Sequence, residues 1–506
     1  MMQRTGDPYV LAIDLGTTAV KATVFSNSGR PIARSGRDVQ LHLPQAHLAE
    51  VNPDEWWRIT VECIRDVVAA LGPDTRLIKA VGVCGLKHAP VLLDERGKPI
   101  APAVLWMDQR CSGQAGRLAT EYGHVFERVC GSLPSTTSSA AKMRWLREQE
   151  PATQARLRHF MLPKDYIRYR LTGEIATDLS DAEGTGLLDA DAGEWSEELL
   201  DLVGLDECVM PQILRAHDMA GRVTAEAARE TGLMVGTSVA VGGSDVHCTM
   251  LGAGMWGRRW PDIVCLYVGT AAWIVRLRAG CRREPRISDT EWVGATATSG
   301  AAFTWLKNLL LGGAPGATAP ECLVAGNLGL DNPYEILTRM AATVEPGSEG
   351  LCFHPHLSGE RGPRENSKAT GAFFGLTLRH QRAHLARAVM EGVAYSIRAV
   401  IDSYNGRPID QLAFVGGASV SLLWRDIISA VTGRTLAFLR TPDATAAGCA
   451  MVAGVCEGLF RDAGEAGEAF VAVAGKCVPD PDLRDVYQVC YRRYEESESV
   501  FESLWR

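Results

Sequence analysis

Two short apolar runs separated by a glycine turn open this chain of 506 residues and constrain its fold more than any other feature. Residues 10–15 and 19–25 are rich in aliphatic side chains, and Gly16 lies between them with two threonines. Short apolar runs bounded by turn residues are typical of buried strands, and the Ser-Asn-Ser-Gly sequence at 26–29 is typical of a hairpin turn. The tract therefore predicts a strand, a glycine turn and a second strand that ends in a hairpin.

The side chains of the first turn are those that a polyphosphate site needs. Asp14 ends the first strand, where a carboxylate can hold a hydrated Mg²⁺, and Gly16 lets the backbone approach a phosphate closely. Thr17 and Thr18 add hydroxyl groups and backbone N–H donors, and Lys21 adds a cation. An ordinary hairpin is the alternative, so the motif needs support from elsewhere in the chain.

Two further glycine turns supply that support. Gly269 and Thr270 follow the apolar residues 263–268, and the pair Gly416-Gly417 follows the apolar residues 412–415. The chain contains no G-x-x-x-x-G-K-[ST] sequence, so it has no P-loop. A glycine pair alone is more often a plain turn. In series, the three turns suggest two similar domains that face each other with a nucleotide between them.

Length and composition agree with two large domains. By length alone, 506 residues correspond to roughly three average domains or two large ones. The glycine-rich residues 251–257 are the candidate boundary, which predicts α/β domains over 1–253 and 254–506. Residues 444–456 form the longest apolar stretch, which is too short and too interrupted by glycine to span a bilayer.

Charge and cysteine usage limit the partners and the compartment. The net charge of −8 argues against a nucleic-acid or anionic-membrane partner. The 14 cysteines are scattered without a C-x-x-C pair, and the polar first residues show no signal peptide. We therefore expect free thiols in a reducing cytoplasm and small-molecule partners.

Asp245 is the candidate general base. It follows Gly242-Gly243-Ser244 at the end of a strand-like run, where small residues leave room for a carboxylate to project into a cleft. The alternative is that Asp245 caps a helix that begins at Val246. The local sequence leaves both interpretations open.

Two further segments carry residues suited to a sugar. Lys87 and His88 end another strand-like run, and Trp106, Asp108 and Arg110 lie within five residues of one another. An aromatic ring beside charged groups makes a stacking and hydrogen-bonding surface for a polyol. The alternative is a structural histidine and a salt-bridged Asp–Arg turn with a half-buried tryptophan.

The pair His354-Pro-His356 offers two imidazoles that could suggest a metal. No carboxylate lies at ligand spacing nearby, and a proline separates the two histidines. The sequence therefore argues against a metal at this position.

The ordered series of motifs resembles the FGGY carbohydrate kinase family, within the actin-like ATPase superfamily and on its xylulokinase-like branch. Over roughly residues 10–454, the motifs follow the family's order. Asp14-Leu-Gly-Thr-Thr resembles the first phosphate motif and Val268-Gly-Thr the second. Leu357-Ser-Gly-Glu-Arg-Gly-Pro is similar to a xylulokinase stretch, and Val415-Gly-Gly-Ala resembles the adenosine motif.

The resemblance implies two actin-like (ribonuclease H-like) ATPase domains around a central cleft, and ATP-dependent phosphorylation of a sugar or polyol hydroxyl. It makes Asp245 the catalytic base and implies that Asp14 and Asp245 hold Mg²⁺. The remaining residues that it implies contact ATP or the sugar are Thr17, Thr18, Lys21, Gly269 and Thr270 at the phosphates, Gly300, Thr304, Gly416, Gly417 and Ser421 at the nucleotide, and Lys87, His88, Trp106, Asp108 and Arg110 at the substrate.

Departures from the family pattern fall at expected sugar contacts. Leu86 and Lys87 stand where xylulokinases have Gln and Met, and Val246 stands where they have Asn after the catalytic Asp. These changes leave the kinase chemistry intact but question D-xylulose as the substrate, although a ketopentose remains the expected class. The other function considered is an actin-like ATPase that couples ATP turnover to a protein partner. A homodimer is left open.

Overall fold

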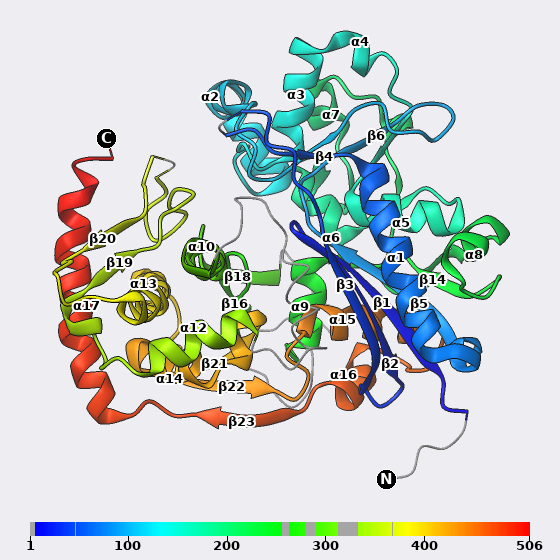
Figure 1. Cartoon of the computed structure of the whole chain (residues 1–506). Helices are drawn as coiled ribbons and strands as arrows, with labels where there is room; N and C mark the ends of the chain where they lie inside the picture. Colours follow the sequence, from blue (N-terminus) through cyan, green and yellow to red (C-terminus); the bar gives the residue numbers. More distant parts are fainter. Residues whose placement is uncertain are drawn as a thin grey trace. The chain divides into compact units, whose positions relative to one another are not determined.

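The computed structural model describes residues 6–45, 47–255, 263–278, 289–311, 332–366 and 368–505. It divides into two compact units (Figure 1). The first comprises Met1–Arg258, Arg282–Asp289 and Ala444–Phe470, and the second comprises Arg259–Cys281, Thr290–Asp443 and Val471–Arg506.

The predicted second domain, 254–506, therefore differs from the second compact unit, because the chain returns to the first unit over Ala444–Phe470. Helix α15 (Ala444–Cys456) explains this return. Its first eleven residues are all buried, so it is a core helix with no solvent-facing stripe. It packs on the first unit's sheet and on α9 (Asp245–Gly252).

The first unit is built on a seven-stranded sheet. Its order is β13-β14-β5-β1-β2-β3, and β15 also pairs with β5. The predicted hairpin is present: β1 runs antiparallel to β2, with Asp14 opposite Lys21, and parallel to β5. These strands are β1 (Tyr9–Leu15), β2 (Ala19–Ser26), β3 (Pro31–Asp38), β5 (Ile78–Gly85), β13 (Met219–Arg222), β14 (Ser238–Ala240) and β15 (Gly243–Ser244).

All seven residues of β1 are buried, which indicates that both faces of the sheet are covered. Helix α1 packs on β2 and β3, and α15 packs on β1 and β5. The helices of this unit, besides α9 and α15, are α1 (Pro53–Leu71), α2 (Ser112–Cys130), α3 (Ser139–Gln149), α4 (Pro151–Gln154), α5 (Pro163–Thr172), α6 (Leu179–Ala182), α7 (Glu197–Val203), α8 (Ala225–Thr231) and α16 (Ala463–Phe470), with 3-10 turns η1 (Gly72–Leu77), η2 (Glu183–Thr185) and η3 (Glu207–Val209).

Within its described residues, the first unit also contains four separate two-stranded sheets. They are β4 (Glu50–Val51) with β7 (Ala103–Val104), β6 (Val91–Leu93) with β8 (His159–Met161), β9 (Ala176–Asp178) with β12 (Gln212–Leu214), and β10 (Leu188–Asp189) with β11 (Glu194–Trp195).

Close backbone packing joins α9 to α15. A Cβ on Gly448 would lie 1.8 Å from the carbonyl oxygen of Cys248, and one on Gly252 would lie 1.9 Å from that of Ala444. Only glycine fits at such an approach, so these two residues set the position of α9 in the core.

The second unit repeats the plan on a six-stranded sheet of order β18-β17-β16-β21-β22-β23. Its first hairpin again has a strand, β16, that runs antiparallel to the next strand and parallel to a later one, β21. The strands are β16 (Val264–Val268), β17 (Ala272–Leu277), β18 (Thr290–Thr296), β21 (Gln411–Val415), β22 (Thr435–Leu439) and β23 (Val473–Cys477).

The helices of the second unit are α10 (Gly300–Leu311), α12 (Pro333–Ala342), α13 (Arg382–Ser403), α14 (Leu422–Thr432) and α17 (Pro481–Glu502), with 3-10 turns η5 (Ser348–Gly350) and η6 (Gly417–Val420) and a strand pair β19 (Cys352–His354) and β20 (Ala372–Phe374). Among the described helices of the chain, none combines the length and apolarity that crossing a membrane requires.

Candidate active site

Three parallel strands of the first unit end at the same edge of the sheet. The register places Asp14 of β1, Cys84 of β5 and Gly243 of β15 side by side in one row. Asp245 follows this row by two residues, and the Lys87–His88 loop follows β5. Because the carboxyl ends of parallel strands form the usual ligand-binding edge of an α/β sheet, three of the predicted site segments meet at a suitable place.

The carboxylate at the first turn is buried. Asp14 is only 7% exposed, and its Oδ2 lies 3.4 Å from Nζ of Lys21 across the β1–β2 hairpin. The turn is closed by a hydrogen bond of 2.9 Å from Gly16 N to Ala19 O. The side chain of Thr17 accepts a hydrogen bond of 3.0 Å from Trp106 Nε1, whereas Thr18 is exposed. The predicted phosphate turn and the predicted sugar loop are therefore joined through Thr17 and Trp106.

Asp245 is the first residue of α9 and does not cap it. Ser244 is the cap residue, and its Oγ accepts a hydrogen bond of 3.2 Å from His247 N. Ser244 therefore has the capping role that the sequence left open for Asp245. The Asp245 Oδ1 accepts a hydrogen bond from Val246 N at 2.8 Å. Desolvation and the charge of Asp14 raise the pKa of Asp245 to about 6, although the charge of Lys87 opposes this rise.

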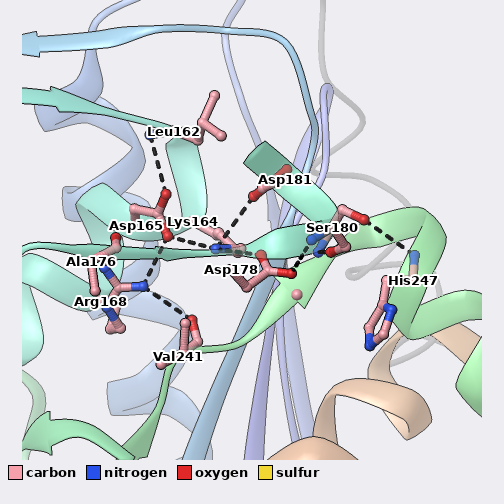
Figure 2. A network of polar contacts seen from close by, with 12 residues as sticks. Leu162, Lys164, Asp165, Arg168, Ala176, Asp178, Ser180, Asp181, Val241 and His247 are labelled. Carbon is pink, nitrogen blue, oxygen red and sulfur yellow. Dashed lines mark hydrogen bonds and ion pairs between the residues drawn. The ribbon is translucent and has the colours of Figure 1, made fainter. Parts of the chain in front are cut away.

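A buried ionic network lies next to the start of α9 (Figure 2). Lys164 has no exposed surface, and its Nζ lies 2.5 Å from Asp165 Oδ1, 3.0 Å from Asp178 Oδ1 and 3.3 Å from Asp181 Oδ2. Arg168 adds a second cation, at 2.8 Å from the same Asp165 oxygen. Buried charges are tolerated when each has partners, and here three carboxylates surround two cations.

The network reaches Asp245 through a relay of hydrogen bonds. Asp178 Oδ2 accepts from Ser180 N at 2.7 Å, and Ser180 Oγ accepts from Ser244 N at 2.9 Å. Ser244 in turn caps α9. The relay therefore fixes the start of the helix that carries Asp245. These residues were not predicted from the sequence. The available signal was the stretch Asp178-Leu-Ser180-Asp181, which places two acids and a serine within four residues.

A buried lysine, Lys142, stabilises the Lys87–His88 loop by a hydrogen bond to its backbone. His88 has a positive φ of 66°, and its Nδ1 lies 2.6 Å from Gly184 O. Lys142, which is 4% exposed, donates to His88 O at 2.6 Å and to Thr137 O at 2.8 Å. Burial lowers the pKa of Lys142 to about 8.

Lys87 lies half-buried against Gly184. A Cβ on Gly184 would approach Lys87 Cε to 2.5 Å, so glycine makes the space that the lysine occupies. In the part of the chain that the structure describes, the Lys87 ammonium forms no ion pair or hydrogen bond.

Asp108 and Arg110 form the salt-bridged turn that was the alternative to a sugar contact. Asp108 is fully buried, and its oxygens accept from Ala49 N, Arg110 N, Arg110 Nε and Arg110 Nη2 at 2.7–2.9 Å. Arg110 also donates to Glu50 at 2.8 Å. Both Asp108 oxygens are occupied, so this pair braces the loop that carries Trp106. The substrate contacts of Asp108 and Arg110 stay predictions.

The second unit brings Gly269, Thr270 and Gly300 together by backbone hydrogen bonds. Gly300 N donates to Gly269 O at 2.8 Å, and Ala301 N donates to Thr270 O at 3.1 Å, so the first turn of α10 rests on the glycine–threonine turn. A Cβ on Gly300 would lie 2.4 Å from Gly269 O. Glycine is therefore required at the start of α10.

The second glycine turn lies at the end of the neighbouring parallel strand. Tyr267 of β16 pairs with Val415 of β21, so Gly416 follows the strand end next to Gly269. Gly416 has φ 94°, and a Cβ there would lie 2.5 Å from Val268 O. Gly417 is exposed. The second unit therefore gathers its predicted nucleotide glycines at one sheet edge.

Two residues with predicted nucleotide contacts have hydrogen-bond partners within the protein. Thr304 Oγ1 lies 3.0 Å from both Gly300 O and Tyr334 Oη. Ser421 caps α14, where its Oγ accepts from Trp424 N at 3.3 Å. These hydroxyls stabilise the first turns of α10 and α14, and their contacts with a nucleotide stay predictions.

The comparisons with known proteins agree with this arrangement. Residues 9–252 match the N-terminal domain of the FGGY family of carbohydrate kinases, and residues 291–456 match its C-terminal domain. The xylulose kinase of Bacillus subtilis is 28% identical, with 96% of each chain covered, and the gluconokinase of the same organism is 28% identical, with 83% of this chain and 82% of the relative covered.

A solved structure extends the likeness to the whole fold. The xylulose kinase of Rhodospirillum rubrum is 29% identical, covers 98% of this chain and 99% of its own, and superposes with a TM-score of 0.76. The expected fold, an α/β chain with two actin-like ATPase domains, is thereby confirmed. Together with the strand-end carboxylates of the first unit and the glycine turns of the second, these matches show that the chain belongs to the FGGY family of carbohydrate kinases.

Proposed function

We propose that this carbohydrate kinase transfers the γ-phosphoryl group of ATP to a hydroxyl of a ketopentose such as xylulose, with Asp245 as the general base. The observation that carries this proposal is the position of Asp245 at the strand-end row that also holds Asp14. Family membership decides for a sugar kinase over an actin-like ATPase that acts on a protein partner.

The proposed reaction is a single in-line displacement. The Asp245 carboxylate accepts the proton of the sugar hydroxyl, the hydroxyl oxygen forms a bond to the γ-phosphorus, and the bond to the β–γ bridging oxygen of ATP breaks to release ADP. A pKa of about 6 keeps Asp245 ionised near neutral pH and basic enough to receive a proton. The Ser180–Ser244 relay supports this role because it limits movement of the carboxylate.

The carboxylates at this edge fit a magnesium ion. Mg²⁺ prefers oxygen ligands and is usually held by one or two carboxylates together with substrate phosphates. Asp14 and Asp245 are two carboxylates of one sheet edge, and the charge of Asp14 already raises the pKa of Asp245. A Mg²⁺ ion held by these carboxylates would relieve that repulsion and neutralise negative charge on the phosphates.

The phosphates are assigned to the glycine turns. In the first unit, Thr18 is exposed and Lys21 supplies a cation next to Asp14. In the second unit, the turns at Gly269 and Gly416 present backbone at neighbouring strand ends. We assign the adenosine end of ATP to the second unit, because its edge offers close backbone approach rather than charge.

A sugar acid is the second candidate acceptor. Lys87 is a half-buried cation in the loop after β5, and its charge acts on Asp245. An ammonium group at this place suits a substrate carboxylate, and one relative of this chain is a gluconokinase. Val246 does not decide between the two acceptors. It stands where xylulokinases have Asn, so it lacks an amide that could bond a hydroxyl group, and both acceptors carry hydroxyl groups.

A coupled-ADP assay separates the candidates. Xylulose, ribulose, gluconate and glycerol are compared at equal concentration, and we expect one of the first three to give the highest kcat/KM. Lys87→Met with Val246→Asn should move kcat/KM toward D-xylulose and away from a sugar acid. An unchanged ranking of substrates in the double variant would remove Lys87 from the substrate site. ATP turnover that no sugar stimulates would contradict the proposed function itself.

A further inference from the structure

A cluster of side chains of metal-binding type lies in the second unit, apart from the residues of the candidate active site. His354 ends β19, His356 follows it by two residues, and Glu498 lies on α17. One ring nitrogen of each histidine and one carboxylate oxygen of Glu498 all lie within 4.8 Å of one another. The carboxylate of this cluster is supplied from more than a hundred residues further along the chain.

The hydrogen bonds of His354 leave one nitrogen lone pair buried. Its Nε2 lies 2.8 Å from Ser497 Oγ, and the Ser497 hydroxyl donates its only proton to Tyr494 O at 3.0 Å. His354 Nε2 must then carry the proton and donate to Ser497, so Nδ1 is an acceptor. His354 has no exposed surface, and within the described residues its Nδ1 has no hydrogen-bond partner. A buried lone pair without a donor is unfavourable unless a cation meets it.

His356 is oriented from its other side by a carboxylate. Its Nδ1 forms an ion pair with Glu360 Oε2, and Glu360 Oε1 accepts from the backbone N–H groups of Arg361 and Gly362 at 3.0 Å each. A carboxylate that holds one imidazole nitrogen, with the other aimed at the ligand, is the usual second-shell arrangement of metal-binding histidines. Here the other nitrogen, Nε2, lies 3.1 Å from Glu498 Oε1.

That separation fits a shared metal ion. Two ligand atoms at 2.0–2.1 Å from a tetrahedral Zn²⁺ are about 3.3 Å apart. The two histidines are buried, whereas the Glu498 side chain is 22% exposed, so the cluster reaches solvent at Glu498. Two imidazoles and one carboxylate suit a borderline divalent ion such as Zn²⁺ better than Mg²⁺.

We propose that His354, His356 and Glu498 bind a divalent transition-metal ion of the Zn²⁺ type, with Glu360 orienting His356 and water completing the coordination. The site would fasten α17 to the segment that follows β19. It is independent of the phosphoryl-transfer site, so it stands or falls separately from the proposed function. The competing arrangement is a proton on His356, shared between Glu360 and Glu498 without a metal.

The experiment measures metal binding and does not use kinase turnover. The full-length protein is stripped with EDTA and titrated with Zn²⁺ by calorimetry in excess Mg²⁺, and with Co²⁺ by visible absorption. All proteins carry His384→Gln, because the rings of His380 and His384 are 5.4 Å apart and would take up a metal adventitiously. Glu498→Gln is the test variant, and Glu496→Gln on the same helix is its matched control.

We expect one Zn²⁺ per chain in the background and in the Glu496→Gln control, at least tenfold weaker binding in Glu498→Gln, and a zinc-dependent rise of Tm that this variant lacks. His354→Leu is a second test, since His354 packs against Tyr494 and Phe501 and leucine is tolerated among such rings. Equal zinc affinity in the background and in both test variants, or no bound zinc at all, would overturn the proposal and leave the proton-shared arrangement.

Discussion

The hairpins β1–β2 and β16–β17 occupy the same place in their two sheets but carry different chemistry. Each leads a strand into a glycine turn beside a second parallel strand. The first edge carries the charged groups Asp14, Lys21, Lys87 and Asp245. The second carries glycines and threonines, and its contacts run through backbone atoms.

The two edges are also held in place differently. Charged side chains support the first edge: Lys142 holds the His88 carbonyl, and the Lys164 network holds the start of α9. Close packing of backbone against backbone supports the second edge. Carbonyl oxygens approach Gly300 and Gly416 so closely that a side chain would not fit at either residue. The difference suggests that the first unit stabilises developing charge while the second fits the shape of a bound nucleotide.

The largest effect is expected at Asp245, the proposed general base. Asp245→Asn keeps the size of the side chain but removes its basicity, so kcat should fall on the order of 10²–10⁴-fold. Steady-state kinetics on the best sugar measure this loss, with circular dichroism as the check on folding. Asp191→Asn, at an exposed position of the same unit, is the control. A near-normal kcat in Asp245→Asn would return this residue to a structural role.

The support of the first edge by charge predicts a dependence of stability on pH. The pKa of Lys142 is about 8 in the folded protein and near 10.5 in the unfolded chain, so between these values the unfolded chain binds more protons. Stability due to Lys142 therefore rises with pH from 8 to 10.5. Relative to Lys142→Met, the free energy of unfolding should grow by up to about 3 kcal/mol over this range.

Urea unfolding of both proteins at pH 7.5 and pH 10 measures this change. Tyrosines and other lysines titrate in the same range in both proteins, so the difference between the two isolates Lys142. A difference that stays constant with pH would mean that the folded and unfolded pKa values of Lys142 are equal, so that the lysine keeps its charge in the folded protein.

Alanine substitutions at two neighbouring glycines, Gly416 and Gly417, test whether close backbone packing supports the second edge. Gly416 has a positive φ, and its Cβ would lie 2.5 Å from a carbonyl oxygen, whereas a Cβ on Gly417 meets nothing within 4 Å. Gly416→Ala should destabilise the protein by about 2 kcal/mol or more, and Gly417→Ala by less than about 0.5 kcal/mol. Thermal unfolding compares them. Equal effects would show that the strand end can relax, and the contrast between the two edges would weaken.

The smallest effect separates side-chain from backbone recognition of the phosphates. Thr18→Val removes an exposed hydroxyl from the first turn, and Thr270→Val does the same in the second. If the first edge uses side chains, Thr18→Val should raise KM for ATP about tenfold, the cost of one hydrogen bond to a charged group. Thr270→Val should change it less than about threefold, since its backbone remains. The reverse order would exchange the roles assigned to the two turns.

Local patterns predicted the strands and turns well. The hairpin, the glycine turns and the strand ends appear where apolar runs meet turn residues, because period and turn chemistry depend on adjacent residues. The type of chemistry also followed from the residue types at these turns. The partners of polar side chains did not follow: Asp108 turned inward to Arg110, and Ser244 rather than Asp245 caps α9.

By itself, the sequence determined the two-unit α/β plan, the order of the phosphate and nucleotide motifs, and the membership in a kinase family that these motifs resemble. Only the tertiary structure decided that α15 returns to the first unit, that three carboxylates surround Lys164, and that Glu498 meets the two histidines. The physical reason is that strands and turns are set by neighbours in the chain, whereas the partner of a buried charge or lone pair is set by packing between residues far apart in the sequence.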